Sequence, residues 1–298
     1  MKKSKSNLLL GLLGLSVIVG IFSGFIPTIF VYSLSLLFAY VSTRYGDVGY
    51  VLPGLAMMLL GGLFLYGPSI SLVEIGLLML YGVFMGMSFS KRLRPEMIYF
   101  PTLAILFAIM LLTFFLQKSL LGVDGLEAVI DTYMNQVQAS VNDPQLLINL
   151  RATIKEFSLS IVFLVAVMLN LFLLWIFSKI LDIRKLKNTG RFHFEFFRLR
   201  ELKFFQIIQL IGLVILGSLL TGMPTQTALG NLVFILIAIF YLQGLSLSIF
   251  LLKSRKRGRI LTALVVLLSL TVPFIQLFLL ILGLIEQSKD FRKLEKVL

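Results

Sequence analysis

The sequence of 298 residues contains no cysteine and one histidine, His193. Without cysteine the chain has no disulfide framework, no thiolate metal site and no cysteine nucleophile. A single histidine does not build a multi-histidine metal site. Charged residues are also scarce, at 14%, whereas a soluble domain carries about 25%. These shortages exclude a disulfide-stapled secreted domain and a soluble enzyme.

The motifs of common catalytic devices are missing as well. The chain has no glycine-rich phosphate-binding loop that ends in Lys-Ser or Lys-Thr, and no Gly-x-Ser-x-Gly elbow. Its apolar segments carry neither an acidic pair of the kind a proton pump uses nor a ladder of arginines. We therefore expect a protein that is not an enzyme and that uses no cofactor and no metal.

Apolar residues, in contrast, make up 58% of the chain and form long uncharged runs. A helix needs about 20 such residues to cross the hydrocarbon core of a bilayer. The runs predict an all-α, polytopic transmembrane helix bundle with about eight spans and a kinked or re-entrant final segment. That segment, 260–285, is interrupted by Pro273, and a plain ninth span is the alternative. The expected spans cover residues 7–24, 27–43, 48–67, 70–90, 98–117, 157–181, 205–222 and 231–252.

The polar segments divide the chain into two parts. Residues 1–182 are predicted to form a six-span membrane core with an outer amphipathic helical insert at 118–156. The insert reads as two helices, which form either a structural cap on the membrane or a lid over an outward pocket. Residues 183–298 are predicted to contain a basic cytoplasmic loop, two further spans, the proline-broken segment and a short tail.

Positive charge sets the expected orientation. With the N-terminus inside, 19 Lys and Arg residues fall at the inner ends of the spans and three in the outer loops. Because inner loops carry an excess of Lys and Arg, we expect a multi-pass protein of the cell membrane with a cytoplasmic N-terminus. The same bias accounts for most of the net charge of +13, so we expect no nucleic-acid partner.

A basic aromatic segment lies within the inner loop. Residues 191–205 alternate phenylalanine with arginine and lysine. Such a segment places its rings among acyl chains and its cations at anionic inner head groups. The alternative is a site for single-stranded nucleic acid. We expect the lipid bilayer to be its partner, and His193 to be simply exposed.

Two polar residues inside the spans are the candidate ligand-binding residues. Glu74 lies near the outer end of the fourth span, and Asn170 lies in the middle of the sixth. An ionisable residue at membrane depth is a functional candidate, so Glu74 either lines an outer cavity or sits at the interface. Asn170 either lines a small-molecule pocket or forms a hydrogen bond between helices.

Small residues at four-residue spacing mark two helix faces. Since lipid gives helices no hydrophobic reason to associate, close packing relies on such residues. Each face packs either within the chain or against a helix of another membrane subunit. The residues are Ser16, Gly20 and Gly24 in the first span, and Gly82 and Gly86 in the fourth.

Four short motifs, in their order along the chain, resemble the YybS-like family of bacterial membrane proteins. They are Arg44-Tyr45-Gly46, Tyr81-Gly82-Val83-Phe84-Met85-Gly86, Leu242-Gln243-Gly244-Leu245 and Asp290-Phe291-Arg292-Lys293. The first six spans of that family are similar to the substrate-binding S components of energy-coupling-factor transporters and to the cell-shape scaffold MreD.

The resemblance implies two functions. One is a small-molecule-binding subunit of an uptake transporter, and the alternative is a structural or scaffolding protein of the cell-envelope machinery. In S components, small residues of the first span, typically alanines, face the coupling subunit. Ser16, Gly20 and Gly24 share that spacing but differ in residue type.

Overall fold

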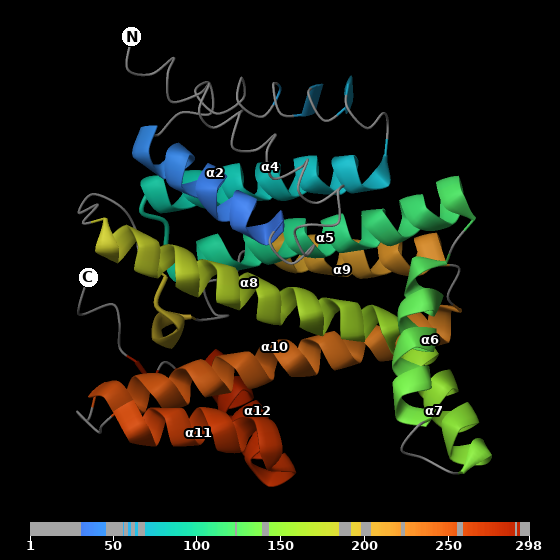
Figure 1. The fold of residues 1–298 in the computed structure, drawn as a ribbon. Coiled ribbons are helices and arrows are strands. Elements are labelled where there is room, and N and C mark those ends of the chain that lie inside the picture. The colour runs from blue at the N-terminus through green and yellow to red at the C-terminus, as the bar shows by residue number, and fades with distance from the viewer. Residues whose placement is uncertain are drawn as a thin grey trace. The chain divides into compact units, whose positions relative to one another are not determined.

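The computed structural model describes most of the chain, and every regular element in the described ranges is a helix (Figure 1). The expectation of an all-α chain is thus confirmed. The expected spans 7–24 and 48–67 lie wholly or largely outside the described residues, as do Ser16, Gly20 and Gly24. The described residues are 31–45, 56, 59–60, 63–64, 69–122, 124–138, 143–184, 192–197, 204–221, 224–254, 259–289 and 291–292.

Ten α-helices and a short 3-10 helix lie within these ranges. The first five are α2 (Val31–Tyr45), α4 (Ile70–Ser90), α5 (Pro95–Leu121), α6 (Gly125–Gln138) and α7 (Pro144–Glu156). The others are α8 (Ser158–Ile183), η3 (Phe194–Phe196), α9 (Phe204–Thr221), α10 (Thr225–Ser254), α11 (Arg259–Thr271) and α12 (Pro273–Ser288).

Four of these helices are long and apolar enough to cross a membrane: residues 71–90, 97–121, 158–183 and 226–254. The pair α11 and α12, bent by 102°, raises the number to five if it counts as one broken span. Among the described residues this is fewer than the eight spans expected. Among the described residues α2 has 15 residues and α9 has 18, and neither is one of these four helices.

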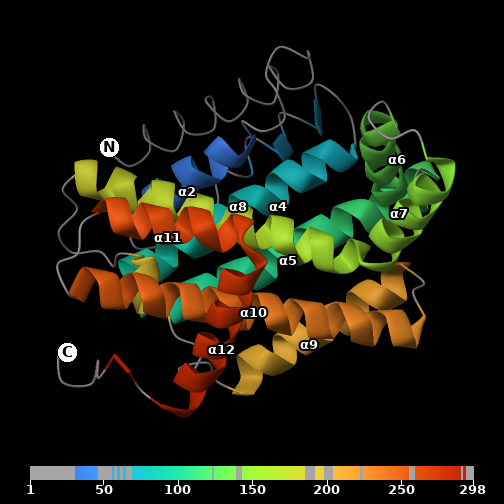
Figure 2. The ribbon, with the colours of Figure 1, turned by 90° about the horizontal axis from the view of Figure 1, so that it is seen from below.

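Local signals in the sequence explain several helix ends. The side chain of Asp143 accepts hydrogen bonds from the backbone N–H groups of Gln145 (2.9 Å) and Leu146 (3.3 Å), and Pro144 occupies the first turn. Nearer the C-terminus, Pro273 starts α12 after the single non-helical residue Val272. The final segment is therefore sharply kinked, and no straight ninth helix forms (Figure 2).

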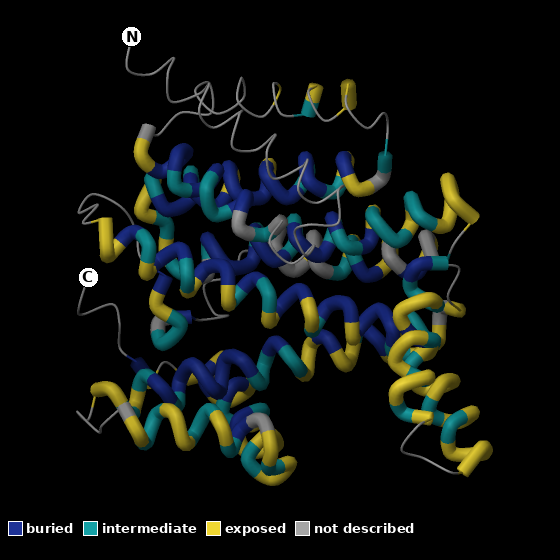
Figure 3. Tube along the Cα trace, in the orientation of Figure 1, coloured by how far each residue is buried: buried dark blue, intermediate teal, exposed yellow. Residues whose placement is uncertain are grey.

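The chain forms two compact units. The first contains residues 1–158 and 165–191, and the second contains residues 159–164 and 192–298. In the first unit α2 packs on α4, and α4 packs on α5, and all three helices contain buried residues (Figure 3).

Two glycines of α4 allow a close contact with α2 in the first unit. A Cβ atom on Gly82 would lie 2.1 Å from the carbonyl oxygen of Ser35, and one on Gly86 would lie 2.2 Å from that of Ala39. The hydroxyl of Thr43 on α2 also donates to the carbonyl of Gly86 (2.9 Å). The small-residue face of α4 is therefore occupied by α2 of the same chain.

The second unit repeats this device with a different helix pair. A Cβ atom on Gly244 of α10 would lie 1.8 Å from the carbonyl oxygen of Leu279, and one on Gly283 of α12 would lie 2.0 Å from that of Phe240. Leu245, Ile249 and Leu279 form the apolar cluster beside this crossing. The pair of glycines thus lets the backbones of α10 and α12 touch.

Candidate functional site

A buried polar cluster joins three helices of the first unit. The hydroxyl of Tyr81 on α4 donates to Oδ1 of Asn170 on α8 (2.8 Å). The amide nitrogen of Asn170 donates to the carbonyl oxygen of Tyr99 on α5 (3.2 Å). All three residues are at most 1% exposed. Both ends of the Asn170 side chain are therefore engaged by neighbouring helices, which matches the second of the two roles that the sequence offers.

Glu74 lies on the same stripe of α4 as Tyr81 but nearer the N-terminal end. Residues four and seven positions apart share a helix face, so Glu74, Leu78 and Tyr81 point to the same side. Leu78 and Tyr81 are buried, whereas Glu74 is half-buried. Seven residues correspond to about 10 Å of helix rise, so Glu74 does not reach Asn170. The structure places the two residues on one side of α4 without bringing them into contact.

Neither Glu74 nor Asn170 lines either of two cavities found along the described helices. An open depression of about 440 Å³ lies on α7 beside Asp143, Asn149 and Thr153. An apolar groove of about 400 Å³ runs along another face of α4, beside Ser69, Val73, Gly76 and Leu80. The groove adjoins Glu74 in sequence, but its lining belongs to the opposite side of the helix.

Ion pairs connect the helices α6 and α7. Arg151 pairs with Asp131 (2.6 Å), and Lys155 pairs with Glu127 (2.7 Å). At the base of α6, Asp124 pairs with Lys118 (3.3 Å). Burial raises the pKa of Asp124, but the backbone N–H of Glu127 and the Lys118 ammonium outweigh it, so this pKa is lowered. The paired charges make the two helices one hairpin.

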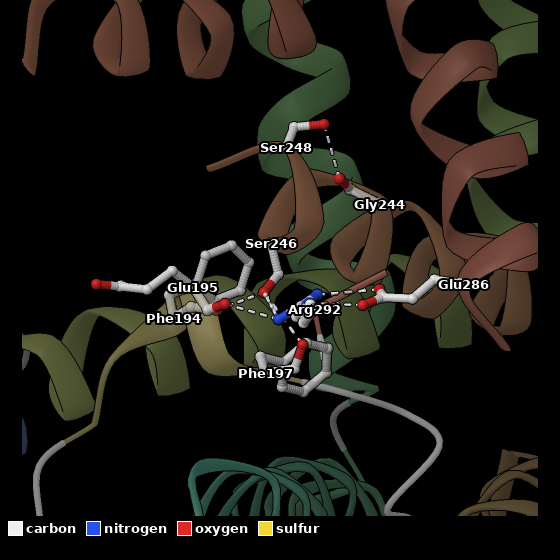
Figure 4. Close-up of polar contacts among 8 residues, drawn as sticks. All are labelled: Phe194, Glu195, Phe197, Gly244, Ser246, Ser248, Glu286 and Arg292. Atoms are coloured by element: carbon white, nitrogen blue, oxygen red, sulfur yellow. Dashed lines mark hydrogen bonds and ion pairs between the residues drawn. The ribbon is translucent and has the colours of Figure 1, made fainter. Parts of the chain in front are cut away.

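A second buried polar cluster lies in the second unit, around Arg292 (Figure 4). Nη2 of Arg292 donates to Oε2 of Glu286 (3.0 Å), and Nε pairs with the other carboxylate oxygen. Nη1 donates to the carbonyl oxygen of Glu195 (2.6 Å) and to Oγ of Ser246 (3.2 Å). The side chains of Arg292 and Glu286 are 0% and 2% exposed. The guanidinium thus binds a carboxylate, a carbonyl and a hydroxyl group at once.

The helix η3 supplies the other wall of this cluster. The hydroxyl of Ser246 donates to the carbonyl oxygens of Phe194 (2.5 Å) and Phe197 (3.1 Å). Nζ of Lys253, near the end of α10, binds the Glu195 carboxylate (2.7 Å). Burial raises the pKa of Glu195, but the hydrogen bond and charge of Lys253 prevail, so this pKa is lowered.

The described part of the segment 191–205 differs from the interfacial arrangement expected. Phe192 and Phe197 are 6% and 0% exposed, so their rings lie inside the protein and not among acyl chains. The reason is that Ser246 and Arg292 bind the backbone of η3 and hold its rings against α10. His193 is exposed, as expected. Residues 191 and 198–203 lie outside the described residues.

Sequence reasoning did not find the Arg292 cluster. Its signal is the single acid, Glu286, which ends the last apolar stretch six residues before Arg292. Such spacing does not identify a pair, because the chain leaves the helix between the two residues. Within the described ranges, no three His, Asp or Glu side chains gather in a manner suited to a metal ion.

Comparisons with known proteins support the membrane assignment. A family model described as "Predicted membrane protein (DUF2232)" matches residues 12–286, which is most of the chain. Comparison with the curated proteins and with the solved structures finds no significant match in either set.

Proposed function

Because the chain belongs to the DUF2232 family of predicted membrane proteins, we propose that it is a non-enzymatic membrane subunit that binds a small polar molecule. The molecule enters from the outer side, as the resemblance to S components of uptake transporters implies. We also propose that the chain is a member of the YybS-like proteins.

The position of Glu74 is the observation that supports the binding of a small polar molecule. It is a half-buried carboxylate on the face of α4 that carries Tyr81 toward the protein interior. An acid in this position is costly in a membrane unless it meets a cation, a hydrogen-bond donor or water. A ligand with a cationic or hydrogen-bonding group fits that requirement, with the Tyr81–Asn170 pair about two turns deeper.

The orientation and span count form part of the proposal. The charge asymmetry of the loops places the N-terminus in the cytoplasm and the N-terminal end of α4 outside. With the expected spans 7–24 and 48–67 and with α2 and α9 also counted as crossings, the four long helices make the eight crossings of the cell membrane that the sequence predicts.

The binding proposal is tested by mass spectrometry of small molecules that co-purify from native membranes. We expect a bound molecule with the unaltered protein, and its loss in Glu74→Gln. Glu156→Gln is the matched control, because it makes the same change at an exposed position near the outer end of α7. Retention of the molecule in Glu74→Gln, or its absence from the unaltered protein, contradicts the proposal.

One observation favours the scaffolding alternative. The Asn170 amide is already satisfied by Tyr81 and Tyr99, so this fully buried polar group is part of the packing of the first unit. A scaffold needs a filled interior, and its function lies on helix faces and cytoplasmic loops. Reproducible co-purification of one membrane protein, with no small molecule, is the result that favours this function over ligand binding.

A further inference from the structure

The final two helices are too short for independent crossings. The 13 residues of α11 span about 20 Å and the 16 residues of α12 about 24 Å, against a hydrocarbon core of about 30 Å. They meet at Val272 with a bend of 102°. A break of this size leaves backbone groups without helical partners, which is tolerated at membrane depth only where protein or water satisfies them.

The contacts of α11 show how deep the segment reaches beside α10. The hydroxyl of Tyr241 donates to the carbonyl oxygen of Ser269 (2.9 Å), close to the end of α11. Tyr241 lies 13 residues before Ser254, or about 20 Å along α10. Because α11 begins only five residues after α10 ends, it runs back along α10 for about its own length. The Tyr241 hydroxyl also satisfies one of the carbonyl groups that the break exposes.

The helix α12 crosses α10, and Arg292, which follows it, brings the chain back toward the C-terminal end of α10. Gly283 meets α10 at Phe240 and Gly244, near the deepest point that α11 reaches. The next contacts lie closer to Ser254: Arg292 binds Ser246, and its guanidinium lies 5.6 Å from the centre of the Phe250 ring. Figure 4 shows this return beside η3. The chain therefore enters and leaves at the same end of α10.

The ion pair fixes this return. Arg292 and Glu286 are buried together, and three groups from different segments bind the same guanidinium. The guanidinium of Arg292 stays protonated even when it is buried. If it moves away from Glu286, the buried carboxylate of Glu286 is left without an opposite charge. A crossing would also carry four cations of the tail outside: Lys289, Arg292, Lys293 and Lys296.

We infer that α11 and α12 form a re-entrant hairpin that returns the C-terminal tail to the same side of the membrane as Ser254. The Arg292–Glu286 pair acts as the clasp that holds the hairpin against η3 and the C-terminal third of α10. This inference goes beyond the proposed function and does not depend on a ligand.

Single-cysteine labelling tests the topology cleanly, because the chain has no cysteine of its own. The variants are Lys296→Cys in the tail, Ser254→Cys at the end of α10 and Asn149→Cys on α7. With an impermeant maleimide on whole cells, we expect Asn149→Cys to react and the other two to react only after permeabilisation. Labelling of Lys296→Cys but not Ser254→Cys in whole cells overturns the inference. Labelling of these two without Asn149→Cys supports the hairpin and inverts the orientation.

Charge reversal tests the clasp. Arg292→Glu places two carboxylates together in the buried site, and we expect a loss of thermal stability in detergent and faster cleavage of the tail by protease. Adding Glu286→Arg to that variant restores an opposite-charge pair, and we expect partial recovery of both properties. Lys289→Glu makes the same charge change at an exposed position and serves as the control. Equal behaviour of Arg292→Glu and Lys289→Glu, or no recovery in the double variant, contradicts the clasp.

Discussion

Glycine-to-alanine changes in the helices test the packing argument most directly, because each adds a single methyl group at a site where the distance to the nearest atoms is known. On Gly86 the added Cβ would lie 2.2 Å from the Ala39 carbonyl oxygen and 2.8 Å from Cβ of Ser42. Real Cβ atoms do not approach another heavy atom closer than about 3 Å, so α2 must move away by roughly 1 Å. The neighbour is backbone, which does not rotate aside as a flexible side chain does.

The expected cost follows from the contacts that this movement loosens. Overpacking of a well-packed core costs about 1–3 kcal/mol, and Thr43 also loses its short hydrogen bond to Gly86. The control is Gly212→Ala in α9, where an added Cβ meets nothing within 4 Å. There the methyl group clashes with nothing, and alanine favours the helix by up to about 1 kcal/mol.

The assay is reversible unfolding of the purified protein in detergent, with SDS as denaturant, for the unaltered chain and each variant. We expect Gly86→Ala to lower the free energy of unfolding by about 1–3 kcal/mol, and Gly212→Ala to leave it unchanged or raise it. Gly244→Ala should behave like Gly86→Ala, because its Cβ would lie 1.8 Å from a carbonyl oxygen. Equal stability of Gly86→Ala and Gly212→Ala would refute the close contact between α2 and α4.

Three further predictions concern buried polar groups. Tyr81→Phe removes the hydrogen bond to Asn170 and should cost about 0.6–1.7 kcal/mol, whereas Tyr133→Phe, at an exposed position on α6, should cost nothing measurable in the same unfolding assay. Gln243→Met should raise the free energy of unfolding by roughly 1–3 kcal/mol, because Gln243 is 0% exposed and neither polar atom of its amide is hydrogen-bonded within the part of the chain that the structure describes. A loss of stability would show that the amide has a partner such as water. The pKa of Glu195 is lowered in the folded protein, so its carboxylate adds stability above the unfolded pKa of about 4.5, and this stability is lost as the pH falls through the folded value. The difference in the free energy of unfolding between the unaltered protein and Glu195→Gln should therefore be full at pH 7 and shrink below about pH 4.5. A difference that widens in acid would contradict the Lys253 contact.

The parts of the fold that could be predicted are those that depend on short stretches of sequence. Long uncharged runs identify α4, α5, α8 and α10, because a helix is the simplest element that satisfies its backbone in lipid. Pro273 breaks the final helix because proline removes an N–H group and clashes with the preceding turn. Asp143-Pro144 starts α7 for equally local reasons.

The parts that could not be predicted depend on contacts between distant segments. Asn231 of α10 accepts hydrogen bonds from the backbone N–H and the hydroxyl of Ser160 (2.8 and 2.6 Å), 71 residues away. It thereby caps the first turn of α8, which has no side-chain cap of its own. Nothing in either local sequence announces this pair. The burial of Phe192 and Phe197 has the same origin, since groups on α10 and the tail hold η3 in place.

The two units solve the problem of helix association in lipid in the same way, and this bears on where function lies. In each, glycines bring two helix backbones into contact, and each unit also contains a buried polar cluster. Glycine contacts alone permit sliding along the helix axis, whereas directional hydrogen bonds do not. Thr43 of α2 forms such a bond to Gly86, Asn170 joins α8 to α4 and α5, and Arg292 binds α10 and η3. Because both clusters are already committed to this structural task, a ligand must use groups outside them. Glu74 belongs to neither cluster and still faces the interior of the first unit, so it is the residue at which a binding function should be sought first.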